Sequence, residues 1–257
     1  GFLYVNDMET LHIALKAETI WHVFGMPITN TLITSVAAAS ILLLVAFLVR
    51  ARISLVPGKV QLVFEMLVGG VLSYMEEMLG DARLAHRFFP LIATIFLFIA
   101  FANILEFVPG VGSVGFFEGS GGHGEFIPLF RSVNTDLNMT LALALISFFA
   151  IEFAGVAALG FLKYAGKFVT FKSPLAFFIG LIELLSEVAR LISFSFRLFG
   201  NIFAGEVLIT VAAFFVPLFL PVPLMLFEVF VGLIQAAIFA LLTLFFIKIA
   251  MMPAEAH

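Results

Sequence analysis

The feature that most constrains this chain is a series of apolar stretches long enough to cross a lipid bilayer. Residues 28–49 contain 22 consecutive residues without a charge, and residues 88–105 contain 18 more. A helix of about 20 residues, rising ~1.5 Å per residue, spans the ~30 Å hydrocarbon core of a membrane. Residues 137–162 form a third run with only Glu152 charged, and the chain is again mostly apolar beyond Pro174. The sequence therefore predicts a multi-pass helical membrane protein.

Composition excludes several other classes of protein. Hydrophobic residues make up 63% of the chain and charged residues 12%, with a mean hydropathy of +1.19. Soluble domains of ordinary composition are far more polar. The net charge of -4 and the sparse basic residues provide no surface for nucleic acid. Because there is no cysteine, disulfides, thiol catalysis and cysteine-ligated metal centres are excluded.

Prolines mark where the last apolar region turns back on itself. Between Pro174 and Pro217 lie 42 residues without a proline, which as one helix extend ~63 Å. Since this is about twice the bilayer, we expect a steeply tilted or near-horizontal helix that pairs with the last helix as an antiparallel hairpin. The predicted fold class is all-α integral membrane, with five long membrane helices in one polytopic domain over 1–257. The predicted spans are 28–49, 88–107, 137–162, 174–216 and 224–251.

Basic residues divide unequally between the two sides of the predicted bundle. Short cytoplasmic loops retain Lys and Arg. One side carries eight such residues, namely Arg50, Arg52, Lys59, Arg83, Arg87, Lys163, Lys167 and Lys172. The opposite side carries two, Lys16 and Arg131. This asymmetry predicts an external N-terminus and a cytoplasmic C-terminus, with 109–135 outside and 163–172 inside.

Two connecting segments have their own patterns. In 59–79, polar and small residues recur at helical spacing on an otherwise apolar segment, which predicts a helix lying in the membrane interface. Residues 109–128 contain seven glycines but lack the ending of a phosphate-binding loop. We expect a flexible external loop there.

The last two predicted helices carry most of the intramembrane polar residues. At about 100° per residue, one stripe of the helix over 174–216 collects Glu183, Glu187, Arg190, Arg197, Asn201 and Gly205. Glu206 falls roughly 100° to 140° from the middle of this stripe, so we expect it to face a different compartment from Arg197. On the last helix, Glu228 and Gln235 are seven residues apart and share a face.

Ionisable groups at membrane depth cost ~2.5–3.5 kcal/mol each on insertion scales and mark ion pathways or paired sites. Glu187 and Arg190 have the spacing of a simple intrahelical ion pair, which is as good an interpretation as a role in conduction. Arg197 lies ten residues from the nearest carboxylate on its stripe and cannot deprotonate. Its spacing predicts a carboxylate partner on another subunit. For Glu152 and Glu106, helix-end or packing roles compete equally with conduction.

These residues also resemble a known family. The run Arg197-Leu198-Phe199-Gly200-Asn201 followed by Ala204-Gly205-Glu206 is similar to the signature of subunit a of F-type ATP synthases. Further resemblance runs along the whole chain, in 27–31, Asn103, 135–140, Glu183, Ser186 and 235–236.

In that family an arginine faces a rotating ring of c subunits, and two offset half-channels exchange protons with the ring carboxylates. The resemblance implies this role for Arg197 and a place on the proton pathway for Asn201, Glu206, Glu228 and Gln235. It places Glu183 on the cytoplasmic exit side. Supporting roles fall to Glu187, Arg190, Ser186 and Asn103.

The chain departs from the family pattern at Glu228. Members of the family have one histidine and one glutamate at the positions of Glu206 and Glu228, whereas this chain has glutamate at both. Proton transfer here rests either on a pair of carboxylates that share a proton or on water.

The resemblance further implies a non-catalytic subunit of ATP synthesis and proton transport, in a bacterial inner membrane, without cofactor or metal. Its partners are the c-subunit ring, the b subunits of the peripheral stalk, the other ATP synthase subunits and lipid. The main alternative is a secondary ion-coupled transporter, which typically shows inverted repeats and broken helices. A structural scaffold accounts for the hydrophobicity but not for Arg197 beside Asn201 and Glu206.

Overall fold

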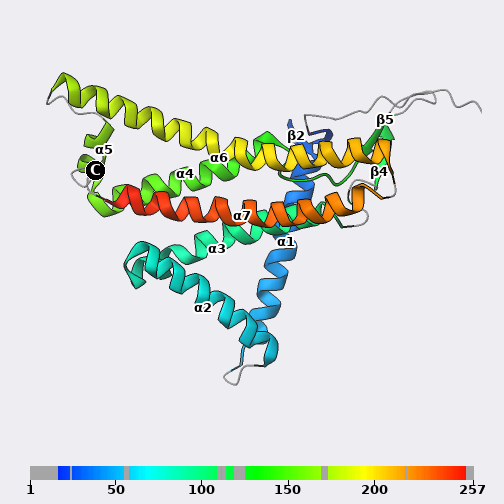
Figure 1. The fold of residues 1–257 in the computed structure, drawn as a ribbon, viewed down its shortest axis with the longest axis horizontal. Coiled ribbons are helices and arrows are strands. Elements are labelled where there is room, and N and C mark those ends of the chain that lie inside the picture. The colour runs from blue at the N-terminus through cyan, green and yellow to red at the C-terminus, as the bar shows by residue number, and fades with distance from the viewer. Residues whose placement is uncertain are drawn as a thin grey trace, which may run out of the picture.

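The computed structural model describes residues 17–23, 25–54, 58–108, 111, 114–118, 125–168, 173–217 and 219–252. Within these residues the chain forms seven α-helices and two small antiparallel hairpins (Figure 1). The helices are α1 (Asn30–Ala51), α2 (Lys59–Leu79), α3 (Ala82–Leu105), α4 (Leu137–Leu159), α5 (Phe161–Phe168), α6 (Pro174–Phe215) and α7 (Pro221–Met251). The fold is therefore essentially all-α, as the sequence predicts.

Four of the helices begin at side chains that suit a helix N-terminus. Thr29, Asp81, Asp136 and Ser173 precede α1, α3, α4 and α6, and each side chain accepts a hydrogen bond from a backbone N–H in the first turn. These bonds satisfy N–H groups that have no partner within the helix. The polar residues beside the apolar runs thus determine where the helices start.

Helices α3, α4, α6 and α7 run side by side as a bundle (Figure 1). Helix α1 leaves this bundle at a steep angle, and α2 returns the chain to the start of α3 (Figure 1). The short helix α5 and the end of α7 lie at one end of the bundle, and the hairpins lie at the other (Figure 1). The bundle therefore has two distinct ends, joined by long helices.

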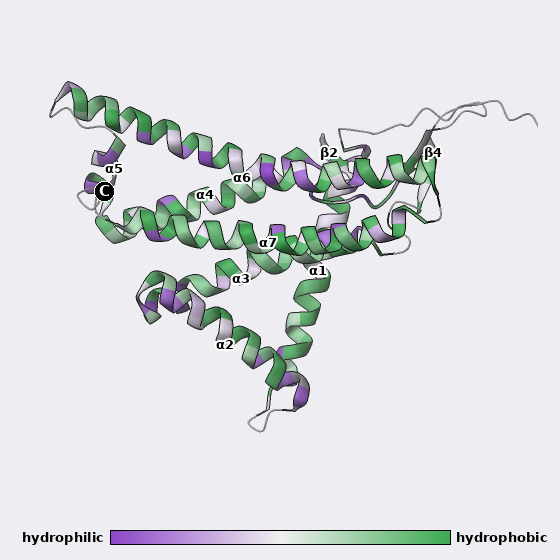
Figure 2. Ribbon diagram, viewed as in Figure 1, coloured by the Kyte–Doolittle hydropathy of each residue, from purple (hydrophilic) through white to green (hydrophobic). Residues whose placement is uncertain are grey.

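Among the described residues, four helices are long and apolar enough to cross a membrane, namely α1, α3, α4 and α7. Most residues of these helices are hydrophobic (Figure 2). Phe149 and Phe153 on α4 are 64% and 66% exposed, which water disfavours and lipid does not. Helix α6, which carries five ionisable residues, is not among these four.

The interior of the bundle is packed with aliphatic and aromatic side chains. Ile99, Leu198 and Leu244 are fully buried, and they come from α3, α6 and α7. The rings of Phe194 and Phe239 lie 5.0 Å apart, centre to centre. Small residues such as Ala236 let α7 approach its neighbours closely, which is how helices associate in lipid.

The helices differ from the predicted spans most clearly at three boundaries. Helix α3 begins at Ala82 rather than at 88, because the Asp81 side chain caps it there. Helix α4 ends at Leu159 rather than at 162 because Gly160 adopts a positive φ of 82°, and the short α5 follows. Helix α7 starts at Pro221 rather than at 224 because a proline is tolerated in the first turn, where its missing N–H has no helical partner anyway.

The hairpins were not expected from the sequence. Strands β1 (Thr19–Val23) and β2 (Met26–Thr29) pair before α1. In the glycine-rich segment, β4 (Gly115–Glu118) pairs with β5 (Glu125–Pro128), so the expectation of a flexible loop is wrong for these residues. Residues 119–124, like 1–16 and 169–172, lie outside the described residues.

Candidate functional site

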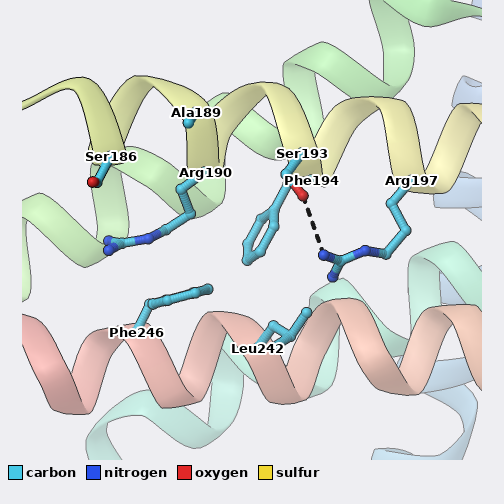
Figure 3. Close-up of a pocket in the computed structure, with 8 residues that line it drawn as sticks. All are labelled: Ser186, Ala189, Arg190, Ser193, Phe194, Arg197, Leu242 and Phe246. Atoms are coloured by element: carbon cyan, nitrogen blue, oxygen red, sulfur yellow. Dashed lines mark hydrogen bonds between the residues drawn. The ribbon is translucent and has the colours of Figure 1, made fainter.

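A pocket of about 310 Å³ opens between α6 and α7 (Figure 3). Its lining comprises Ser186, Ala189, Arg190, Ser193, Phe194, Arg197, Leu242 and Phe246. Two cations therefore line one small space in an otherwise apolar bundle. The Arg190 guanidinium points toward Ser186, away from that of Arg197 (Figure 3).

Arg197 makes only weak contacts in the described part of the chain. Its Nη2 atom donates a hydrogen bond to Ser193 Oγ at 3.2 Å, and its guanidinium lies 6.0 Å from the centre of the Phe194 ring. No ion pair of the described residues includes it, in contrast to Arg190 and Arg131. The guanidinium therefore has free capacity to pair with a carboxylate.

Arg190 is firmly paired. Its Nη1 atom lies 2.6 Å from Glu187 Oε2, and its guanidinium lies 4.0 Å from the centre of the Phe246 ring. This matches the intrahelical pair that the i, i+3 spacing indicates. Arg190 is thus a neutralised cation that lines the pocket, whereas Arg197 is not neutralised by a described residue.

Beyond Arg197, α6 and α7 are joined through an amide pair. Asn201 Nδ2 donates a hydrogen bond of 2.7 Å to Gln235 Oε1. Gln235 is buried, and Asn201 is exposed. The two residues that the sequence assigned to different helices therefore meet directly.

A second group of ionisable residues lies at the hairpin end of α6. Glu206 Oε2 lies 4.0 Å from Arg131 Nη2, and Thr135 also contacts this carboxylate. Arg131 is only 8% exposed and belongs to the segment between β5 and α4. The pairing of Glu206 with Arg131 was not foreseen, because no spacing pattern relates residues of such distant segments.

Glu228 lies against the backbone of α6. A Cβ atom added to Gly205 would overlap all three atoms of the Glu228 carboxyl group. Glu228 is buried, and its Oε1 atom has no hydrogen-bond partner among the described residues. No hydrogen bond of the described residues joins Glu228 to Glu206, so each carboxylate has its own surroundings.

Polar residues of α3 and the segment before α4 extend this second group. Ser132 Oγ donates a hydrogen bond of 2.7 Å to Glu106 Oε2. The charges of Glu206, Glu228 and Arg131 all act on the Glu106 carboxyl group, so Glu106 belongs to the same polar region.

Asn103 links three parts of the chain near this group. Its Nδ2 atom donates to the Gly232 carbonyl at 3.0 Å, and its Oδ1 atom accepts from Asn134 at 2.6 Å. The side chain thus ties α3 to α7 and to the segment before α4.

The remaining predicted residues lie toward the α5 end of α6. Ser186 lines the pocket and donates a hydrogen bond to the Ile182 carbonyl. Glu183 lies nearly one turn earlier and is half-buried. Among the described residues, no three His, Asp or Glu side chains lie close enough to hold a metal ion.

A bundle of apolar helices with an uncompensated arginine and a separate carboxylate group defines a polytopic membrane protein with an internal polar site. The family model described as ATP synthase A chain matches residues 31–248. The chain therefore belongs to the ATP synthase A chain family, whose members serve ATP synthesis and proton transport in membranes.

Relatives named ATP synthase subunit a are similar over most of their length. The protein from Mycobacterium tuberculosis is 37% identical over 243 residues, which cover 91% of both chains. The protein from Campylobacter concisus is 32% identical over 220 residues, or 84% of this chain and 87% of the relative. That from Helicobacter pylori is 32% identical over 222 residues, or 86% and 89%.

Proposed function

We propose that this chain is the non-catalytic, proton-conducting stator subunit of an ATP synthase membrane sector and that Arg197 faces a ring of c subunits. The observation that carries this proposal is the state of Arg197 among the described residues. Arg131 and Arg190 each have a carboxylate on this chain, whereas Arg197 has only a serine and a ring nearby. A guanidinium cannot lose its charge at membrane depth, so a carboxylate from a partner satisfies it best.

The proposed mechanism is electrostatic. A protonated carboxyl group on the ring is neutral and can move through lipid. Close to Arg197 the ionised form is favoured, so the carboxyl group releases its proton there. The fixed cation also repels protons, which prevents direct flow between the two half-channels. Each proton that crosses the membrane yields ~2.3 kcal/mol per 100 mV. Rotation of the ring therefore has to add up the free energy of several protons for each ATP.

The two ionisable groups suit the two half-channels. We assign Glu206 and Glu228 to the outward half-channel. Glu206 lies in the part of α6 that ends beside the hairpins, and Glu228 of α7 contacts α6 there at Gly205. Glu183 and Ser186 lie on the other side of Arg197 along α6 and suit the inward half-channel. The pair of Asn201 with Gln235 supports the position of α6 against α7 between the two.

The proposed membrane topology includes α6 as a fifth long membrane helix. Its 42 residues pack along α4 and α7, and it would cross at a steep tilt with Arg197 toward the ring rather than toward lipid. From the unequal distribution of basic residues we infer that the N-terminus faces outward and the C-terminus faces the cytoplasm. The proposed membrane is a bacterial inner membrane. The b subunits of the peripheral stalk are further partners.

Replacement of Arg197 tests this function. In vesicles that contain the purified complex, Arg197→Ala should abolish ATP synthesis while a passive proton leak persists, because ring carboxylates then exchange with both half-channels. Arg197→Lys should also lose coupled synthesis, since an ammonium lacks the planar fork and can deprotonate when desolvated.

Near wild-type synthesis by Arg197→Ala at equal assembly would show that Arg197 is not the gate. Purification of the chain without a ring of small subunits would instead favour a secondary transporter.

A further inference from the structure

A cluster of ionisable side chains lies where α4, α5 and α6 meet, on the α5 side of Arg197. The Glu152 carboxyl group on α4 has two side-chain partners, the Tyr164 hydroxyl from α5 and Glu187 from α6. Glu187 is only 8% exposed and is paired with Arg190. Neither the intrahelical pair nor the proposed gate explains why a second, half-buried carboxyl group lies here.

The backbone of α4 is adapted to this cluster. Gly155 follows Glu152 by nearly one turn, and a Cβ atom on Gly155 would overlap the Tyr164 ring. The ring therefore lies directly on α4, where its hydroxyl reaches Glu152. Burial, and then the neighbouring Glu152, raise the pKa of the Tyr164 phenol above its usual value. Tyr164 thus keeps its phenolic proton at physiological pH and can donate a hydrogen bond to the carboxyl group.

The charges in the cluster do not balance if both carboxyl groups ionise. Glu152 and Glu187 would carry two negative charges, and Arg190 supplies one positive charge. A net charge left in the hydrocarbon region is costly, and two carboxylates in contact repel each other. One proton held between Glu152 and Glu187 makes the cluster neutral. Glu152 Oε1 is buried without a hydrogen-bond partner among the described residues, so it has room to accept a further bond.

Other charged groups near the cluster do not supply the missing charge. Lys167 lies on α5, with its Nζ atom 5.3 Å from the centre of the Tyr164 ring. Its ammonium donates to the carbonyl of Met252 at 2.8 Å, at the end of α7. Helix α7 contributes the Phe246 ring, which covers Arg190. The balance therefore rests on Glu152, Glu187 and Arg190.

The pocket connects this cluster to the gate. Glu187 precedes Arg197 by ten residues on α6, which corresponds to a separation of ~15 Å along the helix. The pocket runs along this stretch, with Ser186 and Arg190 at one end and Arg197 at the other (Figure 3). Among the apolar side chains of the pocket, Ser193 and Ser186 therefore provide polar groups between Arg197 and the ion pair of Arg190 with Glu187.

We propose that Glu152 and Glu187 share one proton and form an additional proton-binding site on the inward half of the pathway, with Tyr164 as a positioning residue. This site rests on the proposed function for its direction of flow. In one transfer, water in the pocket gives a proton to the Glu187 carboxylate as the shared proton moves fully onto Glu152. Glu152 then passes a proton to water on the α5 side, which restores the original charges.

Infrared spectroscopy of the purified complex in lipid tests the shared proton. At neutral pH we expect a protonated carboxyl band that disappears in Glu152→Gln and shifts in Tyr164→Phe, which loses one hydrogen bond but keeps the ring. The matched control is Ser147→Ala, because Ser147 is buried on the same helix and has no hydrogen-bond partner among the described residues. An unchanged band in Glu152→Gln at full assembly would overturn the proposal.

Passive proton flux through the membrane sector in vesicles tests the role in the pathway. We expect Glu152→Gln to conduct at least ~10-fold more slowly than Ser147→Ala, since a positioned proton-transfer group typically contributes more than water alone. ATP synthesis should slow in proportion and remain coupled, unlike in Arg197→Ala. If the band disappears but flux equals that of the control, the shared proton is static and the pathway role is wrong.

If Glu152→Gln does not assemble, Tyr164→Phe tests the proposed site instead. A shifted band with slower flux then supports the site, and an unshifted band overturns it. Loss of synthesis in Arg197→Ala is a separate measurement, so the proposed function can stand or fall independently.

Discussion

Gly205→Ala is a small change with a large expected effect, because the glycine makes room for a carboxyl group. The added methyl would overlap Cδ, Oε1 and Oε2 of Glu228. Nonbonded carbon atoms keep ~3.5 Å apart, so the carboxyl group has to retreat by on the order of 1 Å. A misplacement of about 1 Å at a reacting group can cost on the order of 10²-fold in rate. That corresponds to ~2.7 kcal/mol in the barrier.

Proton flux through the reconstituted membrane sector measures this effect. Gly69→Ala is the matched control, because Gly69 lies inside α2 with nothing within 4 Å of an added Cβ atom. Combining Gly205→Ala with Glu228→Asp should restore part of the flux, since the shorter side chain withdraws the carboxyl group by ~1.5 Å. Wild-type flux in Gly205→Ala, at equal assembly, would refute the reasoning that the fit of Glu228 against α6 controls proton transfer.

Three further predictions concern other contacts. The double variant Glu206→Gln with Glu228→Gln should slow proton flux without uncoupling it from synthesis, and unchanged flux in vesicles would mean that both carboxylates are structural. A double-mutant cycle of Asn201→Ala and Gln235→Ala, followed by unfolding in lipid, should give a coupling energy of about 0.6 to 1.7 kcal/mol, and additivity would contradict the hydrogen bond. A cysteine at position 167 should react with impermeant reagents only from the cytoplasmic side, so external labelling would overturn the proposed orientation.

Much of the fold was accessible from the sequence because helices in lipid follow local rules. Apolar runs of bilayer length and polar residues that cap them predict helices wherever they occur. The amphipathic spacing of 59–79 corresponds to α2, Lys59–Leu79, almost residue for residue. The hairpins were missed because strand pairing depends on partners across a turn, and the glycine-rich composition indicated only a loop.

The polar stripe of α6 and the isolation of Arg197 also followed from the sequence, since residues of one helix stand at fixed angles and distances. The partners of that stripe did not. Asn103 bonds to the carbonyl of Gly232, 129 residues away, and Arg131 reaches Glu206 from a segment that the sequence indicated only as external. Glu152 and Glu187 approach each other only because α4 packs on α6. The hydrophobicity of a segment and the helical spacing of its polar residues determine each helix separately. Side-chain packing between helices decides which charged residues meet, and only the tertiary structure contains that information.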